Sequence, residues 1–207
     1  MKLPRLAGFA LLLPLAACSS LLDVQRTPFT IYSPQLSARP VAGPDVGWQL
    51  AVETPLASDV LDSTRIAVMP SAGIIEVFPG ARWSDNAPVL LRNLLVQAFE
   101  GSDRITGVGS AVTGIRADYA LAMELYAFQL DLTDGAPHAV VRLQARLVDY
   151  ASNRVLASHL FETTMPAAGT DVASAFAALE AALNDTVSAI VAWTLATGER
   201  QRADATP

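Results

Sequence analysis

The chain has 207 residues, of which 52% are hydrophobic, and this is enough for one domain with a sizeable core. Its 14 basic and 20 acidic residues give a net charge of −6, which argues against a nucleic-acid partner because such partners reward a clustered positive surface. The single cysteine excludes an intrachain disulfide framework and a thiolate metal cluster. Packing must therefore stabilise the fold.

Residues 1–17 have the layout of a secretory signal. Lys2 and Arg5 form a short cationic start, and an apolar run at residues 6–15 follows. This run is shorter than the roughly 20 apolar residues that a membrane-spanning helix needs. We therefore predict a signal peptide that is removed, after which 12 basic and 20 acidic residues leave a net charge of −8.

Residues 15–18, Leu-Ala-Ala-Cys, resemble the bacterial lipobox, in which the cysteine thiol forms a thioether with diacylglycerol and becomes the acylated N-terminus. The resemblance implies that Cys18 is the lipid attachment site and that the protein is held to a membrane. Ser19 and Ser20 follow, so the aspartate that commonly retains lipoproteins at the inner membrane is missing. Resemblance to sorted lipoproteins thus implies the outer membrane, facing the periplasm. An ordinary signal peptide followed by a cysteine is the alternative.

Residues 18–45 are predicted to be a lipidated tether with one short extended piece at 29–32, because three prolines interrupt any periodic pattern. Alternating or β-branched apolar residues then predict strands at 48–53, 65–69 and 74–78. Pro70 is expected to end the second of these strands, and the Pro79–Gly80 pair is expected to turn the chain after the third.

The clearest local signal in the body is residues 82–88, Arg-Trp-Ser-Asp-Asn-Ala-Pro, which precede a helical pattern. Asp85 is the predicted N-cap, Pro88 is tolerable in the first turn, and Gly101 is placed to end the helix. Trp83 has two interpretations at this helix entry. It either packs in the core or contacts a partner.

A short strand is predicted at 104–108, followed by an antiparallel meander of three strands at 119–132, 139–149 and 155–164, with a hairpin turn at Asp134 and Gly135. The apolar positions of the first meander strand change phase, which predicts a β-bulge near Leu125 and Tyr126. In the second strand, alternate residues are expected to face inward: Ala139, Val141, Leu143, Ala145 and Leu147. Arg142 and Arg146 then face outward, where they form either a solvated surface or a contact with a partner.

Thr170 or Asp171 is the predicted cap of a long final helix, which Gly198 is expected to end, leaving residues 198–207 as a flexible tail. Its apolar stripe is interpreted as core rather than as a lipid groove, and its charged residues argue against a membrane span. Together these elements predict one α/β (α+β) domain at residues 46–197, with a mixed, mostly antiparallel sheet packed by two main helices.

This order of features resembles the ABC-type transport auxiliary lipoprotein family, which includes PqiC-like lipoproteins. The best-matching parts are residues 29–34, 65–68, 82–85 and 147–150, whereas Phe78 departs from a tyrosine that is often found before the arginine–tryptophan pair. The resemblance implies a non-enzymatic docking component of a lipid-trafficking system, in which a permease and its ATPase work with an MCE-domain protein that crosses the periplasm. Ring-shaped homo-oligomers fit the same resemblance.

Signals for catalysis are weak. His138 and His159 are isolated, and no lysine follows the signal peptide, which excludes a P-loop. Gly107 and Gly109 begin like a dinucleotide loop, but the next glycine comes too late and a strand pattern follows. We expect no enzyme activity, no cofactor and no metal site. An independent structural or assembly lipoprotein is the alternative function, and an envelope hydrolase is the least favoured.

Overall fold

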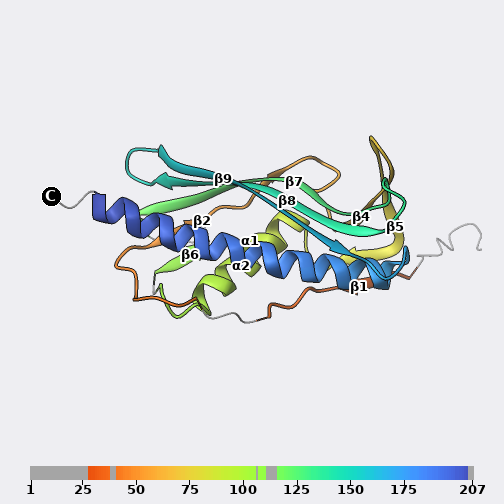
Figure 1. Ribbon diagram of the computed structural model, residues 1–207, viewed down its shortest axis with the longest axis horizontal. Helices are drawn as coiled ribbons and strands as arrows, with labels where there is room; N and C mark the ends of the chain where they lie inside the picture. The colour runs from red at the N-terminus through yellow and green to blue at the C-terminus, as the bar shows by residue number, and fades with distance from the viewer. Residues whose placement is uncertain (1–27, 38–40, 106, 111–115, 205–207) are drawn as a thin grey trace, which may run out of the picture.

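The computed structural model describes residues 28–37, 41–105, 107–110 and 116–204. These residues form a mixed sheet of nine strands packed by two helices (Figure 1), which confirms the predicted fold class. The strands are β1 (Thr30–Tyr32), β2 (Leu50–Val52), β3 (Leu56–Ala57), β4 (Arg65–Ser71), β5 (Ile74–Trp83), β6 (Val108–Ser110), β7 (Tyr119–Asp131), β8 (His138–Asp149) and β9 (Arg154–Pro166), and the helices are α1 (Ala87–Glu100) and α2 (Val172–Asp204). Cys18 lies outside the described residues.

The sheet is built around the antiparallel meander of β7, β8 and β9, which confirms that prediction. On its other edge β7 pairs in parallel with three short strands, β2, β3 and β4. β4 continues antiparallel into β5, β5 pairs in parallel with β1, and β2 also pairs in parallel with β6. The meander is therefore the long, regular part of the sheet, and the shorter strands extend it.

The predicted bulge is confirmed in β7. Leu125 pairs with Leu143, and the next pair joins Ala127 to Arg142, so Tyr126 is the extra residue. Its side chain is exposed on the outer face, and because of the extra residue the inward-facing set resumes at Phe128 instead of Ala127.

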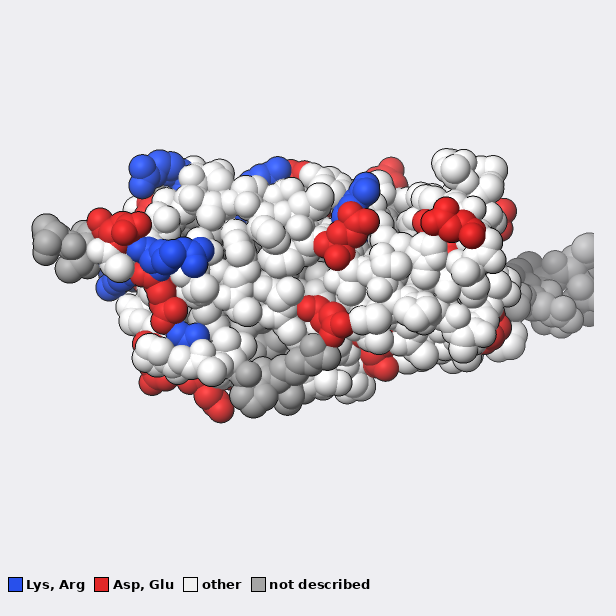
Figure 2. Space-filling model, in the orientation of Figure 1, with Lys and Arg blue, Asp and Glu red and all other residues white. Residues whose placement is uncertain are grey.

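The core lies between the inner face of the sheet and the helices. The five residues of β8 predicted to face inward are all completely buried. α2 packs along β8 and β9, and α1 packs beside α2 and over β6. Figure 2, in the same orientation, shows that this side of the molecule is mostly uncharged, and α2 exposes several alanines there.

α2 begins after Asp171, whose carboxylate accepts hydrogen bonds from the backbone N–H groups of Ala173 (3.0 Å) and Ser174 (3.1 Å). Of the two predicted caps, Asp171 is therefore the one used. By length and composition this helix could cross a membrane, but 56% of its most apolar window is buried inside the fold. The helix packs on the sheet as a core element.

Two predicted strand ends are wrong. β4 runs through Pro70, and β5 runs through Pro79 and Gly80 as far as Trp83. Both prolines lie where the register between β4 and β5 shifts. Arg65 pairs with Arg82 while Ala67 pairs with Val77, and Pro79 lies in this shift. A second shift follows Val68 and includes Pro70. Bulges accommodate proline and glycine within a strand because no ladder hydrogen bond is lost there.

The start of α1 also differs from the prediction. Asn86, not Asp85, is the N-cap residue, and the Asp85 carboxylate instead accepts a hydrogen bond from the Asn86 backbone N–H at 2.8 Å. Pro88 in the first turn and Gly101 at the C-cap are as predicted. The short strand expected at 104–108 is displaced to Val108–Ser110, which is β6.

The part of the predicted tether that the structure describes packs on the body, and its predicted extended piece at 29–32 forms β1. β1 pairs with β5, and the Gln35 and Ser37 backbone N–H groups donate to Glu180 (2.8 Å) and Asn184 (2.7 Å) of α2. Further along, the Arg104 guanidinium donates to the carbonyl oxygens of Ala42 and Pro44. Residues 18–27 and 38–40 of the predicted tether lie outside the described residues.

Gly198 does not end α2, which continues to Asp204. A Cβ atom at this position would lie 2.7 Å from Cε2 of Trp48 and closer still to Cζ2. The glycine therefore allows the buried Trp48 ring to pack directly against the helix backbone.

We expect Gly198→Ala to lower the free energy of unfolding, although alanine usually favours a helix interior by about 1 kcal/mol. Overpacking of a well-packed core costs about 1–3 kcal/mol, and the Trp48 ring against which the new methyl group would press is only 3% exposed. Urea denaturation measures the difference. As a control, Ala196→Gly on the exposed side of the same helix should cost about 1 kcal/mol through propensity alone. A Gly198→Ala variant more stable than the wild type would contradict the packing argument.

Candidate functional site

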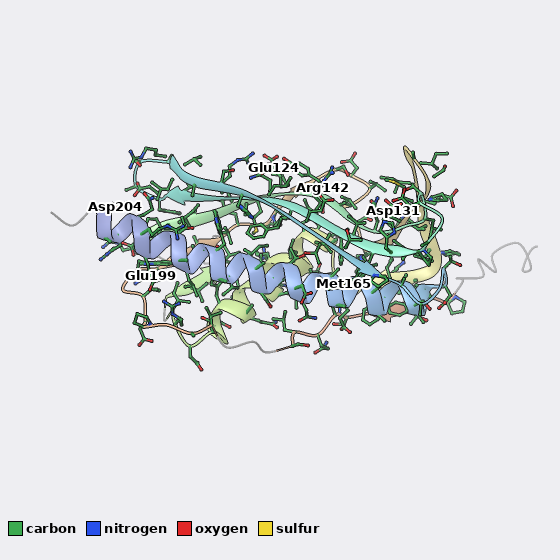
Figure 3. The ribbon with its side chains drawn as sticks, in the orientation of Figure 1. Glu124, Asp131, Arg142, Met165, Glu199 and Asp204 are labelled. Carbon is green, nitrogen blue, oxygen red and sulfur yellow. The ribbon has the colours of Figure 1, made fainter. Side chains whose placement is uncertain are left out.

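The outer face of the meander, opposite α2, carries a group of interacting polar and aromatic side chains. We call Glu124, Tyr126, Arg142 and Arg146 the outer-face cluster. Figure 3 shows Glu124 and Arg142 on the side of the strands away from α2. Arg142 is exposed and Arg146 half-buried, which agrees with the predicted outward direction of both side chains.

The sequence places these residues together through strand alternation and register. Arg142 and Arg146 alternate with the fully buried residues of β8, so they share its outer face. Glu124 pairs with Gln144, which lies between the two arginines, and Tyr126 is the bulged residue of β7.

Glu124 is the centre of the cluster. Its carboxylate oxygens accept a hydrogen bond from Arg146 Nη1 at 2.8 Å and from the Tyr126 hydroxyl at 2.7 Å. The Arg142 guanidinium carbon lies 5.9 Å from the centroid of the Tyr126 ring, within the range of a cation–π contact. The phenol ring is thus held by a carboxylate at its hydroxyl and by a guanidinium near its face.

Mutual hydrogen bonding fixes the charges of this cluster. The hydrogen bond from Arg146, followed by that from Tyr126, lowers the pKa of Glu124. The hydrogen bond that Tyr126 donates to Glu124 raises the pKa of the phenol. The hydrogen bond between Arg146 and Glu124 likewise raises the pKa of Arg146. At neutral pH the carboxylate and guanidinium are charged and the phenol is neutral, so these three groups are poorly suited to exchange protons as general acids or bases.

Arg142 carries a positive charge that the fold leaves available. Its register partner on β9 is Glu162, yet within the described part of the chain Arg142 forms no ion pair. An arginine and a tyrosine side by side on a rigid, exposed surface are the residue types that dominate the energy of protein–protein contacts. The cluster is therefore suited to bind a protein surface that presents an acidic group.

Trp83 is not part of this surface. It is 2% exposed, and its ring stacks on Phe128 with centroids 4.8 Å apart and an interplanar angle of 6°. Of its two interpretations, the structure thus places it in the core.

Neither histidine belongs to a catalytic arrangement among the described residues. His138 Nδ1 lies 3.0 Å from a backbone oxygen, and the His159 ring packs against Phe161. No group of three histidine, cysteine or acidic side chains that could hold a metal ion occurs in the described ranges. Sequence reasoning did not select Glu124 or Tyr126 as site residues, although the phase change at Tyr126 was the signal that could have done so.

Comparison with known proteins identifies relatives over most of the chain. The sequence model of the ABC-type transport auxiliary lipoprotein component family matches residues 29–191. An uncharacterized protein of Bradyrhizobium diazoefficiens is 30% identical over 152 residues, which are 70% of this chain. They are only 39% of that relative, so the chain spans well under half the length of the curated relative that it matches.

Solved structures show the same fold. The crystal structure of a Xanthomonas campestris protein from the family DUF330 is similar with a TM-score of 0.80 and 38% identity, covering 84% of this chain and 99% of that one. A second crystal structure, of an uncharacterized protein, shares only 16% identity with a TM-score of 0.64 over 79% of this chain and 97% of that one. The chain belongs to the ABC-type transport auxiliary lipoprotein component family.

Proposed function

We propose that this protein is a non-enzymatic outer-membrane lipoprotein that docks an MCE-type ABC transport system for intermembrane lipid trafficking. Its family is named for an auxiliary component of ABC-type transport, which supports a role beside a transporter rather than in catalysis. The lipobox-like residues 15–18 supply the anchor through Cys18. In this proposal an MCE-domain protein, working with its permease and ATPase, is the direct partner.

The observation that carries the docking role is the outer-face cluster. Three of its side chains, Glu124, Tyr126 and Arg146, are already held by hydrogen bonds, so ordering them on binding costs little additional side-chain entropy. An acyl anchor would confine this surface to the membrane and raise its effective concentration for a partner that reaches the same membrane. Arg142 would pair with an acidic group of that partner, and Arg146 and Tyr126 would form the adjoining contact.

Affinity purification of the tagged lipoprotein from membranes tests this proposal. We expect the wild type to recover an MCE-domain protein and Arg142→Ala to recover about tenfold less, since truncating a central interface arginine commonly costs more than 1 kcal/mol. The matched control is Arg154→Ala, which removes another exposed arginine at the start of β9 and should leave recovery unchanged. If both variants recovered as much MCE-domain protein as the wild type, the outer-face cluster would not be the docking surface.

Other outcomes point to the alternative functions. Recovery of outer-membrane assembly factors without an MCE-domain protein would favour an independent structural or assembly lipoprotein. Turnover of a lipid ester that one serine or histidine substitution abolishes would instead indicate a hydrolase. Ring-shaped homo-oligomers belong to the same proposal, and the molar mass of the purified lipoprotein tests them.

A further inference from the structure

The tip of the β4–β5 hairpin exposes apolar side chains. Ile74 is 52% and Ile75 is 40% exposed, and no charged residue occurs from Ile66 to Ile75. Figure 1 shows the hairpin standing out at the upper right, and Figure 2 shows an uncharged projection there with acidic side chains below it. Single exposed hydrophobic residues are ordinary, but two exposed isoleucines at the end of one uncharged projection make its tip apolar on both faces, which suits an apolar partner.

The chain enters the body from the direction of this tip. β1 is parallel to β5, with Thr30 opposite Ala81 and Tyr32 opposite Trp83, so the segment that precedes β1 comes from the hairpin side. Pro28 lies next to Gly80, because a Cβ atom on Gly80 would be 3.6 Å from the Pro28 carbonyl oxygen. At about 3.3 Å per residue along β5, Ile74 is within roughly 20 Å of that point.

The length of chain before Pro28 limits how far the body can stand from the lipid anchor. Cys18 is ten residues earlier. Even when fully extended, ten residues span at most about 35 Å. The anchor can therefore lie no farther than about 35 Å from Pro28, and the hairpin tip lies within roughly 20 Å of the same point.

Two further apolar side chains flank the point of entry. Phe29, which directly precedes the edge strand β1, is 53% exposed, and Ile31 within β1 is 60% exposed. The Arg82 guanidinium lies 4.8 Å from the centroid of the Phe29 ring and places a cation beside this apolar group. A lipid surface offers both acyl chains for such side chains and a phosphate for the arginine.

We propose that the β4–β5 tip enters the interfacial layer of the membrane that carries the anchor, with Ile74 and Ile75 against phospholipid acyl chains. The inference rests on the proposed function at one point, which is the acylation of Cys18. Because the tip is uncharged and the neighbouring side chains in Figure 2 are acidic, the contact is apolar and does not need anionic lipid. It provides a second attachment point and so fixes the tilt of the body on the membrane.

A single introduced thiol tests the contact. Cys18 is the only cysteine, and its sulfur is blocked in the lipoprotein, so Ile75→Cys creates one reactive site. The purified lipoprotein is labelled there with an environment-sensitive fluorophore and reconstituted into phosphatidylcholine vesicles. We expect the emission of the label to move to shorter wavelength when the protein binds vesicles. We also expect nitroxide groups on the lipid acyl chains to quench this emission, and the quenching to persist at high salt. The matched control is Ala196→Cys, an exposed position in the C-terminal part of α2, which should show neither effect. Figure 1 shows that this end of α2 lies at the opposite end of the molecule from the hairpin.

The outcomes separate this inference from its premise. Labelling of the wild-type protein would show a free Cys18 thiol and contradict the anchor itself. An unquenched label at position 75 on protein that floats with the vesicles would overturn the tip contact and leave the anchor intact. Equal quenching at both positions, or an emission change that depends on protein concentration without vesicles, would also overturn it, the latter in favour of contact with a second copy.

Discussion

Trp83→Ala is expected to lower the free energy of unfolding by about 3–5 kcal/mol, the range for removing a large aromatic side chain from a core. The ring stacks on Phe128 of β7, and its centroid lies 6.2 Å from that of Phe176 in α2. Trp83 is the last residue of β5, so removing its side chain opens a cavity between β5, β7 and α2. Urea denaturation with a constant m-value measures the loss.

The matched variant for this position is Trp83→Phe, which keeps an aromatic ring on Phe128 and should lose clearly less stability than Trp83→Ala. The pair also tests the placement of Trp83 in the core by its effect on stability. One result would contradict the core placement. If Trp83→Ala changed the free energy of unfolding by less than about 0.5 kcal/mol, as surface substitutions do, and the protein failed to recover its partner, Trp83 would be a contact residue.

The meander could be predicted from the sequence because its signals are local. Alternation with a period of two identifies the buried face of β8, and a break in the alternation of β7 is sufficient to find the bulge at Tyr126. The cap at Asp171 is equally local, since its carboxylate bonds to backbone groups within three residues.

Elements that depend on distant partners were missed. Gly198 has the sequence signature of a helix end, yet its function is to make room for Trp48, which is far away in the sequence. Arg104 was placed in a strand, whereas the fold buries it and pairs it with Glu199 at a nitrogen–oxygen distance of 2.6 Å. A local pattern carries no information about which residue 95 positions away will approach.

The candidate site shows the same division. Strand alternation was enough to direct Arg142 and Arg146 outward. Which groups they contact depends on the register between β7 and β8, which sets Glu124 beside Arg146 and Tyr126 beside Arg142. Sequence reasoning therefore found the cations of the outer-face cluster but not the carboxylate that organises them.

Cys18→Ala is expected to abolish labelling of the protein with radioactive palmitate and to leave the precursor uncleaved by the lipoprotein peptidase. Alanine has no sulfur for the thioether, and no other cysteine in the chain can replace it. Each buried CH2 adds about 0.8 kcal/mol, so the loss of two or three acyl chains removes far more membrane affinity than the exposed side chains of the hairpin tip can restore.

The Cys18→Ala protein should consequently disappear from the outer-membrane lipoprotein fraction, as measured by separation of the two membranes and immunoblotting. Ser20→Ala, which keeps the residues of the lipobox-like motif, should retain both the label and the location. Efficient palmitate labelling of Cys18→Ala would mean that acylation occurs elsewhere, whereas normal cleavage without any label in the wild type would identify an ordinary signal peptide. In that second case a protein with a net charge of −8 would have little to hold it to a membrane, and docking at a membrane surface would lose its physical basis.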